Sequence, residues 1–262
     1  SDLNEVWSDD EVHAVINATT NKFHYKITKD ALLNGKHVLS EKPLTLTAIE
    51  CDELKSIAEE RKLMLLTEYT YTFSKALKIA TKMVERGEIG SLLGAEMSVR
   101  HLGRFGGGSV YWLLGSHMLS VLDMFMPLED LTFSKRDIVV FKGTIETGVI
   151  VFENSDFAGH IVVSLNYPSK ETKIILYGEE GSIIYDPLSN YPLEITRYER
   201  LKWTVADKLP KDVNRMSMDE SNNLKYAIEY LYDCIQGKAE SNIRRASLIT
   251  RIIEKIESSG RA

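Results

Sequence analysis

The sequence has few of the residues that mark disulfide-rich, membrane-spanning or metal-binding proteins. Only two of its 262 residues are cysteine, Cys51 and Cys234, and their spacing fits neither a disulfide framework nor a metal site. No apolar run approaches the roughly 20 residues that a membrane-spanning helix needs. The first residues show no basic stretch followed by an apolar one, so we expect no signal peptide. We therefore predict a cytoplasmic protein that uses neither a metal ion nor a membrane.

Positive charge is not in excess either. The 32 lysines and arginines are outnumbered by 38 aspartates and glutamates, which gives a formal net charge of −6. This balance argues against nucleic acid as the main partner, because binding to phosphates needs a basic surface. The apolar fraction of 44% excludes a disordered chain, and the length favours two domains or one large domain.

The first 70 residues alternate between strand-like and helix-like segments. Apolar runs at 12–18, 37–40 and 63–67 predict buried strands. Helical spacing at 22–34 and a capping residue at Thr47 predict helices between them. Such an order forms a parallel, doubly wound sheet, whose ligands bind beyond the carboxyl ends of the strands. Those ends carry Thr19, Thr20 and Asn21, then Glu41, Lys42 and Pro43, and finally Glu68 and Tyr69.

The pattern changes after about residue 90 to consecutive strands joined by short turns, which predicts a large, mostly antiparallel sheet. One helix near 109–125 interrupts the strands, and two helices close the chain. The predicted fold class is α/β plus α+β: an incomplete Rossmann-type parallel sheet in residues 1–72, then an α+β domain in residues 73–262. The final helices are free to pack back on the first domain. The predicted strands are 92–101, 137–141, 144–153, 157–166, 171–177, 181–185, 193–198 and 201–205.

Two polar positions at element ends are candidates for chemistry. Lys42 follows a buried strand, where partial burial lowers the pKa of a lysine and suits it to exchange a proton with a hydroxyl. Pro43 restricts the backbone before it and can follow a cis bond. His117 lies in the helix near 109–125 and can hydrogen-bond a substrate hydroxyl. The alternatives are an ordinary Lys-Pro loop entry and a buried core histidine.

A third polar cluster lies at the turn from the first strand to the first helix. Thr19, Thr20, Asn21 and His24 gather there, and helix N-termini attract anions and polar ligands. The alternative is that these residues only cap the helix. The glycines at 106–108 do not form a GxGxxG fingerprint, so we expect no phosphate binding there.

Together these segments resemble the glucose–fructose oxidoreductase/inositol dehydrogenase (Gfo/Idh/MocA) family. The resemblance covers essentially the whole chain and rests on several stretches in their order. They are VINATTNKFHYKITKDALLNGKHVLSEKPLTLT, VERGEIGSLLGAEMSV, GGGSVYWLLGSHMLSVLDMF, GVIVFEN, KIILYGEEGSIIYD and ASLITRIIEKIESSG.

The resemblance implies an N-terminal Rossmann domain that binds NAD or NADP and a C-terminal α+β domain. It implies that Lys42 acts as acid/base beside the nicotinamide and the substrate hydroxyl. The cofactor-binding residues that it implies are Thr19, Thr20, Asn21, His24, Glu41, Lys42 and Pro43. His117 corresponds to a histidine that faces the substrate, with a catalytic role beside Lys42. The predicted substrate-binding residues are Tyr69, Arg104, Trp112 and His117.

The sequence departs from the family pattern in four places. The first strand and its GxGxxG turn are absent from the 262 residues, so we expect these residues alone to bind NAD(H) and NADP(H) negligibly. Leu113 stands where many relatives have an aspartate four residues before the histidine. Thr72 stands where many have an arginine, and the connection from Arg100 to Gly106 is short.

These observations predict an NAD(P)-dependent oxidoreductase that moves a hydride between nicotinamide and a hydroxyl or carbonyl of a sugar, cyclitol or related polyol. The first alternative is an impaired family member that acts as a ligand-binding or regulatory subunit, which the losses at 72 and 113 favour. The second is a structural protein that oligomerises. The second domain has too few helices to cover both faces of its sheet, so we expect a homodimer or homotetramer through the open face.

Overall fold

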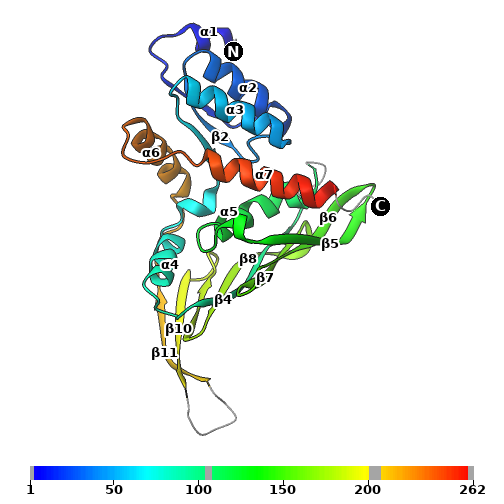
Figure 1. The fold of residues 1–262 in the computed structure, drawn as a ribbon, viewed down its shortest axis with the longest axis vertical. Helices are drawn as coiled ribbons and strands as arrows, with labels where there is room; N and C mark the ends of the chain where they lie inside the picture. The colour runs from blue at the N-terminus through cyan, green and yellow to red at the C-terminus, as the bar shows by residue number, and fades with distance from the viewer. Residues whose placement is uncertain (1–2, 104–107, 201–207, 259–262) are drawn as a thin grey trace. The chain divides into compact units, whose positions relative to one another are not determined.

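The computed structural model describes residues 3–103, 108–200 and 208–258, whose helices and strands are labelled in Figure 1. The chain divides into two compact units. The first unit comprises residues 1–70 and 223–262, and the second comprises residues 71–222. The two closing helices thus belong to the first unit, and the domain bounds 1–72 and 73–262 stay a prediction.

The first unit contains a parallel sheet with the strand order β1-β2-β3. The strands are β1 (Ala14–Asn17), β2 (His37–Glu41) and β3 (Leu65–Glu68). The helices are α1 (Leu3–Ser8), α2 (Asn21–Leu33), α3 (Ala48–Glu60), α6 (Asn223–Ile235) and α7 (Ile243–Ser258). Thr47 caps α3 as its sequence position predicts, since its side chain accepts a hydrogen bond from the Glu50 backbone N–H. This alternation confirms the predicted parallel sheet.

The first predicted strand differs from the expectation of a buried run at 12–18. In the structure it is the shorter strand β1, and its Ile16 side chain is 53% exposed. The reason is its place at the edge: among the described strands, β1 pairs only with β2. A Val- and Ile-rich run therefore indicated a strand correctly but not its burial.

One amide side chain joins the closing segment to the edge of this sheet. Asn242, between α6 and α7, accepts a hydrogen bond from the Thr67 backbone N–H at 2.8 Å and donates one to the Thr67 carbonyl at 2.8 Å. Ser247 on α7 donates to Asp52 on α3 at 2.8 Å. The segment after residue 223 is thus hydrogen-bonded to both the sheet and a helix of the first unit.

The second unit is built on an eight-stranded sheet with the order β11-β10-β9-β8-β4-β7-β6-β5. All neighbours are antiparallel except β4 and β7, which confirms the predicted fold class. The strands are β4 (Leu92–Leu102), β5 (Thr132–Phe141), β6 (Thr144–Glu153), β7 (Ala158–Ser164), β8 (Asn166–Gly178), β9 (Gly181–Tyr185), β10 (Leu193–Arg200) and β11 (Lys208–Met216). The strand expected at 201–205 lies outside the described residues.

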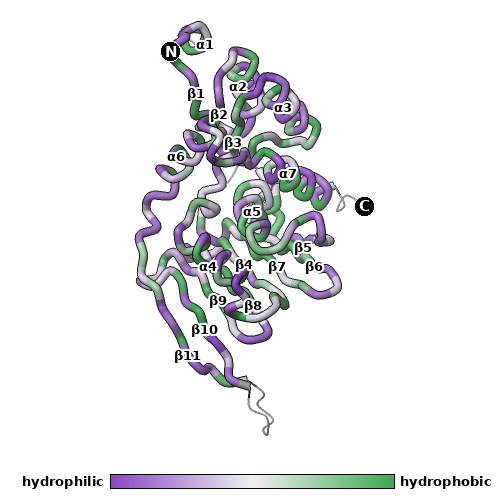
Figure 2. The backbone as a smooth tube through the Cα atoms, turned by 60° about the vertical axis from the view of Figure 1, so that its left-hand side comes forward, coloured by the Kyte–Doolittle hydropathy of each residue, from purple (hydrophilic) through white to green (hydrophobic). Residues whose placement is uncertain are grey.

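Burial alternates along these strands because successive side chains point to opposite faces of a sheet. In β6, Ile150 and Phe152 are fully buried, whereas Val149 and Val151, which alternate with them, are half-buried. Figure 2 shows this kind of alternation as changes between green and purple along β10 and β11. One face of the sheet is therefore covered and the other is only partly buried.

Short helical segments of the second unit accompany the covered face. They are the 3₁₀ turn η1 (Thr70–Phe73, which begins at the end of the first unit), α4 (Lys75–Glu85), the π-helical turn η2 (Tyr111–Gly115), α5 (Ser116–Leu122) and the 3₁₀ turn η3 (Leu128–Asp130). The helix expected near 109–125 is thus divided into η2 and α5. Across the described residues, no helix has both the length and the apolar character to cross a bilayer.

Tyr111 fixes the start of this helical segment on the sheet. Its side chain is fully buried, and its hydroxyl lies 2.8 Å from Asp137 Oδ1 at the edge strand β5. The ring crosses β6 at Gly148, where a Cβ atom would come within 2.2 Å of the tyrosine oxygen. Residue 148 must therefore lack a side chain for η2 and α5 to seat in this place.

We predict that Gly148→Ala lowers the free energy of unfolding by about 1–3 kcal/mol, the usual cost of overpacking a close-packed core. Urea unfolding of the wild type and the variant measures this difference. In a Tyr111→Leu background the shorter side chain removes the contact, so the same substitution should cost much less. Equal costs in the two backgrounds would show that Tyr111 does not set the requirement for glycine.

Candidate functional site

In the first unit, the loops that follow β1 and β2 are joined by one imidazole. His24 on α2 is 1% exposed, and its Nδ1 lies 2.7 Å from the Pro43 carbonyl while its Nε2 lies 2.9 Å from the Thr19 carbonyl. Both partners only accept hydrogen bonds, and a neutral imidazole has a single N–H. The structure therefore brings together the two predicted cofactor segments through His24.

The turn after β1 is organised by Asn17 rather than by helix capping. The buried Asn17 side chain donates to the His24 carbonyl and to Thr28 Oγ1, both at 3.1 Å, and accepts a hydrogen bond from Thr19 Oγ1 at 2.8 Å. Thr20 occupies the N-cap position of α2, but its side chain makes no capping hydrogen bond. The exposed Thr20 hydroxyl is thus not consumed by the helix, so the capping alternative does not describe it.

The segment after β2 carries the predicted acid/base residue. The strand ends at Glu41, and the peptide bond between Lys42 and Pro43 is cis. The Lys42 backbone N–H lies 3.3 Å from Glu41 Oε2, and both side chains are half-buried. Pro43 is buried and presents its carbonyl to His24. Lys42 therefore lies at the carboxyl end of the central strand of the described sheet, at the edge where ligands of such sheets bind.

Glu68 adds a buried carboxyl group at the same edge. It pairs in register with Glu41 and is 3% exposed. Burial raises the pKa of Glu68 to about 7, the hydrogen bond from Thr70 (2.6 Å to Oε2) opposes this rise, and the nearby Glu41 charge adds to it. Among the described residues, Glu68 Oε1 has no hydrogen-bond partner. Sequence analysis noted Glu68 only as a strand end.

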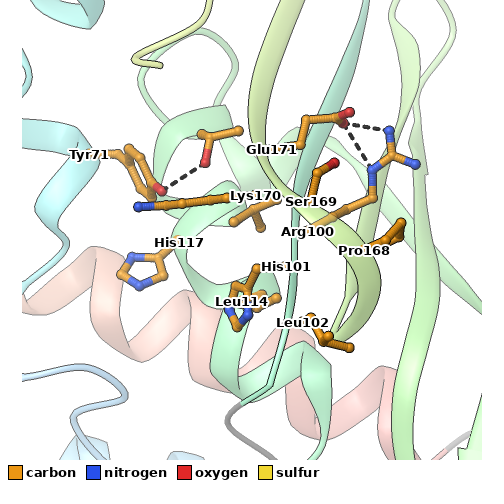
Figure 3. A pocket seen from close by; sticks show the side chains of 12 residues that line it. Tyr71, Arg100, His101, Leu102, Leu114, His117, Pro168, Ser169, Lys170 and Glu171 are labelled. Carbon is orange, nitrogen blue, oxygen red and sulfur yellow. Dashed lines mark hydrogen bonds and ion pairs between the residues drawn. The ribbon is translucent and has the colours of Figure 1, made fainter.

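The second unit has a pocket of its own, with a volume of about 490 Å³ (Figure 3). It lies where β4 ends and β8 begins, close to α5. The lining residues are Tyr71, Val99, Arg100, His101, Leu102, Leu114, His117, Pro168, Ser169, Lys170, Glu171 and Thr172.

His117 meets the ring of Tyr71 edge to face in this pocket. The two ring centres lie 5.3 Å apart at an angle of 89°. The Tyr71 hydroxyl lies 3.1 Å from Thr172 Oγ1, and burial raises the pKa of Tyr71. Tyr71 therefore keeps its proton at neutral pH and offers a hydroxyl group beside the imidazole of His117.

Arg100 and Glu171 form an ion pair at the other side of the pocket. Arg100 Nε donates to Glu171 Oε1 at 2.9 Å, and Ser98 Oγ donates to the same oxygen at 2.6 Å. Although burial alone raises the pKa of Glu171, these hydrogen bonds lower it overall. The Arg100 guanidinium also lies over the ring of Tyr167, 4.2 Å from its centre. Both charges of the pair are thus satisfied within the protein.

The predicted substrate-binding residues do not lie together in the structure. His117 lines the pocket. Tyr69 lies in the first unit and is 1% exposed, whereas Trp112 in η2 is 8% exposed and does not line the pocket. Arg104 lies outside the described residues. The roles of these four residues stay predictions.

Sequence analysis did not identify Tyr71, Arg100, His101 or Lys170 as pocket residues. The run of three charged side chains at positions 170, 171 and 173 was the available signal. Elsewhere, among the described residues, no three His, Cys, Asp or Glu side chains form a group that could hold a metal ion.

The chemistry of the first unit's side chains fits a dinucleotide's nicotinamide half. Lys42 supplies a cation, Glu41 a carboxylate, and Thr19 and Thr20 supply exposed hydroxyls at the carboxyl ends of parallel strands. Ribose hydroxyls both donate and accept hydrogen bonds, so this mixed set matches them. These residues would hold that half of the cofactor.

Comparison with known proteins gives consistent matches. Residues 1–69 match the oxidoreductase family with an NAD-binding Rossmann fold. An uncharacterized oxidoreductase of Synechocystis sp. is 35% identical over 92 residues, which is 35% of this chain and 25% of that protein. An uncharacterized oxidoreductase of Escherichia coli is 27% identical over 200 residues, which is 70% of this chain and 56% of that protein. The chain thus spans about a quarter to about half the length of these relatives.

A solved structure extends the likeness to the whole fold. Levoglucosan dehydrogenase, in complex with NADH and levoglucosan, superposes with a TM-score of 0.84 over 99% of this chain and 80% of that chain, at 17% identity. At this identity the likeness concerns the fold. Two of these proteins are named as oxidoreductases and the third as a dehydrogenase.

The raised pKa of Glu68 predicts a pH-dependent stability. The carboxyl keeps its proton up to about pH 7 in the folded protein but loses it near 4.5 in the unfolded chain. Between these values the unfolded chain binds fewer protons, so the free energy of unfolding falls as the pH rises. The whole loss is on the order of 3 kcal/mol, since one pKa unit is about 1.4 kcal/mol.

Glu68→Gln removes this titration and should give a flatter profile from pH 5 to pH 8 in urea unfolding. Glu60→Gln, at an exposed position on the end of α3, is the matched control and should keep the slope of the wild type. Parallel profiles for the wild type and Glu68→Gln would contradict the buried, protonated carboxyl.

Proposed function

We propose that the chain, whose residues 1–69 match the Gfo/Idh/MocA oxidoreductase family, takes part in the transfer of a hydride between NAD(P) and a hydroxyl or carbonyl group of a sugar, cyclitol or related polyol. The observation that carries this proposal is the polar group at the carboxyl ends of β1 and β2. There His24 bonds to both loops, which present Thr19, Thr20, Glu41 and Lys42. The solved levoglucosan dehydrogenase supports a sugar-like substrate.

NAD(P), when bound, supplies the group that accepts or donates the hydride. Thr19, Thr20, Asn21 and Glu41 are proposed to hold its nicotinamide half by hydrogen bonds. Lys42 is proposed to exchange a proton with the substrate: its amine takes the hydroxyl proton during oxidation and its ammonium returns it during reduction. His24 acts as a positioning residue, because its contacts are to backbone carbonyls of the two loops.

The second unit is proposed to bind the substrate in the pocket that contains His117. Tyr71 and His117 offer a hydroxyl and an imidazole, the groups that hydrogen-bond sugar hydroxyls. The volume of about 490 Å³ suits a monosaccharide-sized ligand. His117 then orients the substrate or shares the proton of a substrate hydroxyl. Tyr71 lies beside His117 in the same pocket.

We further propose that two copies associate through the partly buried face of the eight-stranded sheet. Val149, Val151, Val162, Ile175 and Ile184 lie half-buried on this face, and the exposed apolar surface of a sheet is commonly covered by a partner.

Light scattering at micromolar concentration should give a dimer or a tetramer, and Val162→Glu should shift it toward the monomer because it buries a charge in the interface. A monomeric wild type would contradict this association.

Lys42→Met should lower kcat/KM by 10²–10⁴-fold, the usual contribution of general acid–base catalysis. The substitution keeps a side chain of similar length but removes the group that exchanges the proton. Turnover is followed by NAD(P)H absorbance in the full-length protein, with a panel of sugars and cyclitols as substrates.

Lys26→Met, at an exposed position of α2, is the control and should leave turnover unchanged. Calorimetry with NADH should show that Lys42→Met retains cofactor binding to within a few fold. Full turnover in Lys42→Met would remove its assigned role.

A further inference from the structure

The pocket of the second unit holds one cation that the protein itself does not neutralise. Lys170 is exposed, and among the described residues it has neither a hydrogen-bond nor an ion-pair partner. The chain as a whole is acidic, with a formal net charge of −6. The positive charge of Lys170 therefore does not reflect the overall charge of the protein and is specific to this pocket.

The alternation of β8 places Lys170 on the same face of the sheet as Thr172. Register pairs Thr172 with Val99, and Glu171 with Arg100. Because successive side chains of a strand point to opposite faces, Lys170 and Thr172 share one face, and Glu171 lies on the other. Figure 3 shows the Lys170 side chain extending toward Tyr71 and His117, away from the Arg100–Glu171 pair.

Glu171 does not supply the missing negative charge. It is the single carboxylate among the twelve described residues that line the pocket. Its Oε1 already accepts hydrogen bonds from Arg100 and Ser98, and these bonds lower its pKa overall. The face that carries Lys170, Tyr71 and His117 thus presents donors and a positive charge without a compensating anion.

We propose that the substrate bound in this pocket is a sugar or polyol that carries an anionic group, a carboxylate or a phosphate, and that Lys170 binds this group. The inference rests on the proposed function and specifies its substrate class. Lys170 is then a specificity-determining residue, because a charge-assisted hydrogen bond to the anion favours it over a neutral analogue.

The test compares the binding of glucuronate, glucose 6-phosphate and glucose by calorimetry, in the presence of NADH, to the wild type and two variants. Lys170→Gln removes the free cation. Lys173→Gln removes the same charge from the same strand on the opposite face and is the matched control. Glucuronate carries a carboxylate and glucose 6-phosphate carries a phosphate, so the comparison shows which of the two anionic groups Lys170 binds.

We expect the wild type to bind at least one of the two anions ten or more times more tightly than glucose. Lys170→Gln should reduce this preference to within about twofold, and Lys173→Gln should preserve it. The preference should also weaken as salt rises, since the contact is exposed.

Equal binding of glucose and both anions, or no binding of either anion at millimolar concentration, overturns the proposal. The proposal is also overturned if Lys170→Gln keeps the wild-type preference for the anion over glucose, or if Lys173→Gln loses that preference as fully as Lys170→Gln does. Turnover of neutral polyols without anion preference would overturn this inference and leave the proposed function intact. If the pocket prefers anions but no hydride transfer to or from any polyol is detected, the proposed function is overturned, while the preference of the pocket for anionic ligands stands.

Discussion

The position of the first unit's polar loops depends on the two hydrogen-bonding contacts of the His24 ring. The ring contacts the carbonyl of Pro43 on one side and that of Thr19 on the other, at 2.7 and 2.9 Å. A buried imidazole between two acceptors is favourable only where both loops keep these positions, because an unmet polar group in a protein interior is costly. The same ring therefore sets the spacing of Thr19, Thr20, Glu41 and Lys42.

A comparable constraint operates in the second unit through sterics. Tyr111 occupies the space above Gly148 that any other residue would fill, and its hydroxyl lies 2.8 Å from a carboxylate oxygen of Asp137. Because η2 continues directly into α5, the seating of Tyr111 also sets where His117 lies along the sheet. In the first unit the hydrogen-bonded ring of His24 positions two loops. In the second unit the absence of a side chain at Gly148 allows Tyr111, and with it the start of the helical segment, to pack on the sheet.

The sequence predicted best those features that depend on local chemistry. The capping by Thr47 and the end of a strand just before Lys42 follow from residue types at short spacing. The exposure of β1 depends on its neighbours in the sheet, and a Val- and Ile-rich run does not report them. The pocket residue Lys170 was missed because β8 begins at Asn166, five residues before the predicted strand. Without that start, the alternation that assigns Lys170 to a face could not be applied.

The departure at position 113 is consistent with the charge of the pocket. Many members of the family that the sequence resembles have an aspartate four residues before the histidine, where this chain has Leu113. Here His117 meets the ring of Tyr71, whose hydroxyl contacts Thr172. Leu113 itself does not line this pocket, whose single carboxylate among the described lining residues is Glu171. Leucine at position 113 adds no further negative charge to this segment, and the proposed role of Lys170 rests on the residues that line the pocket.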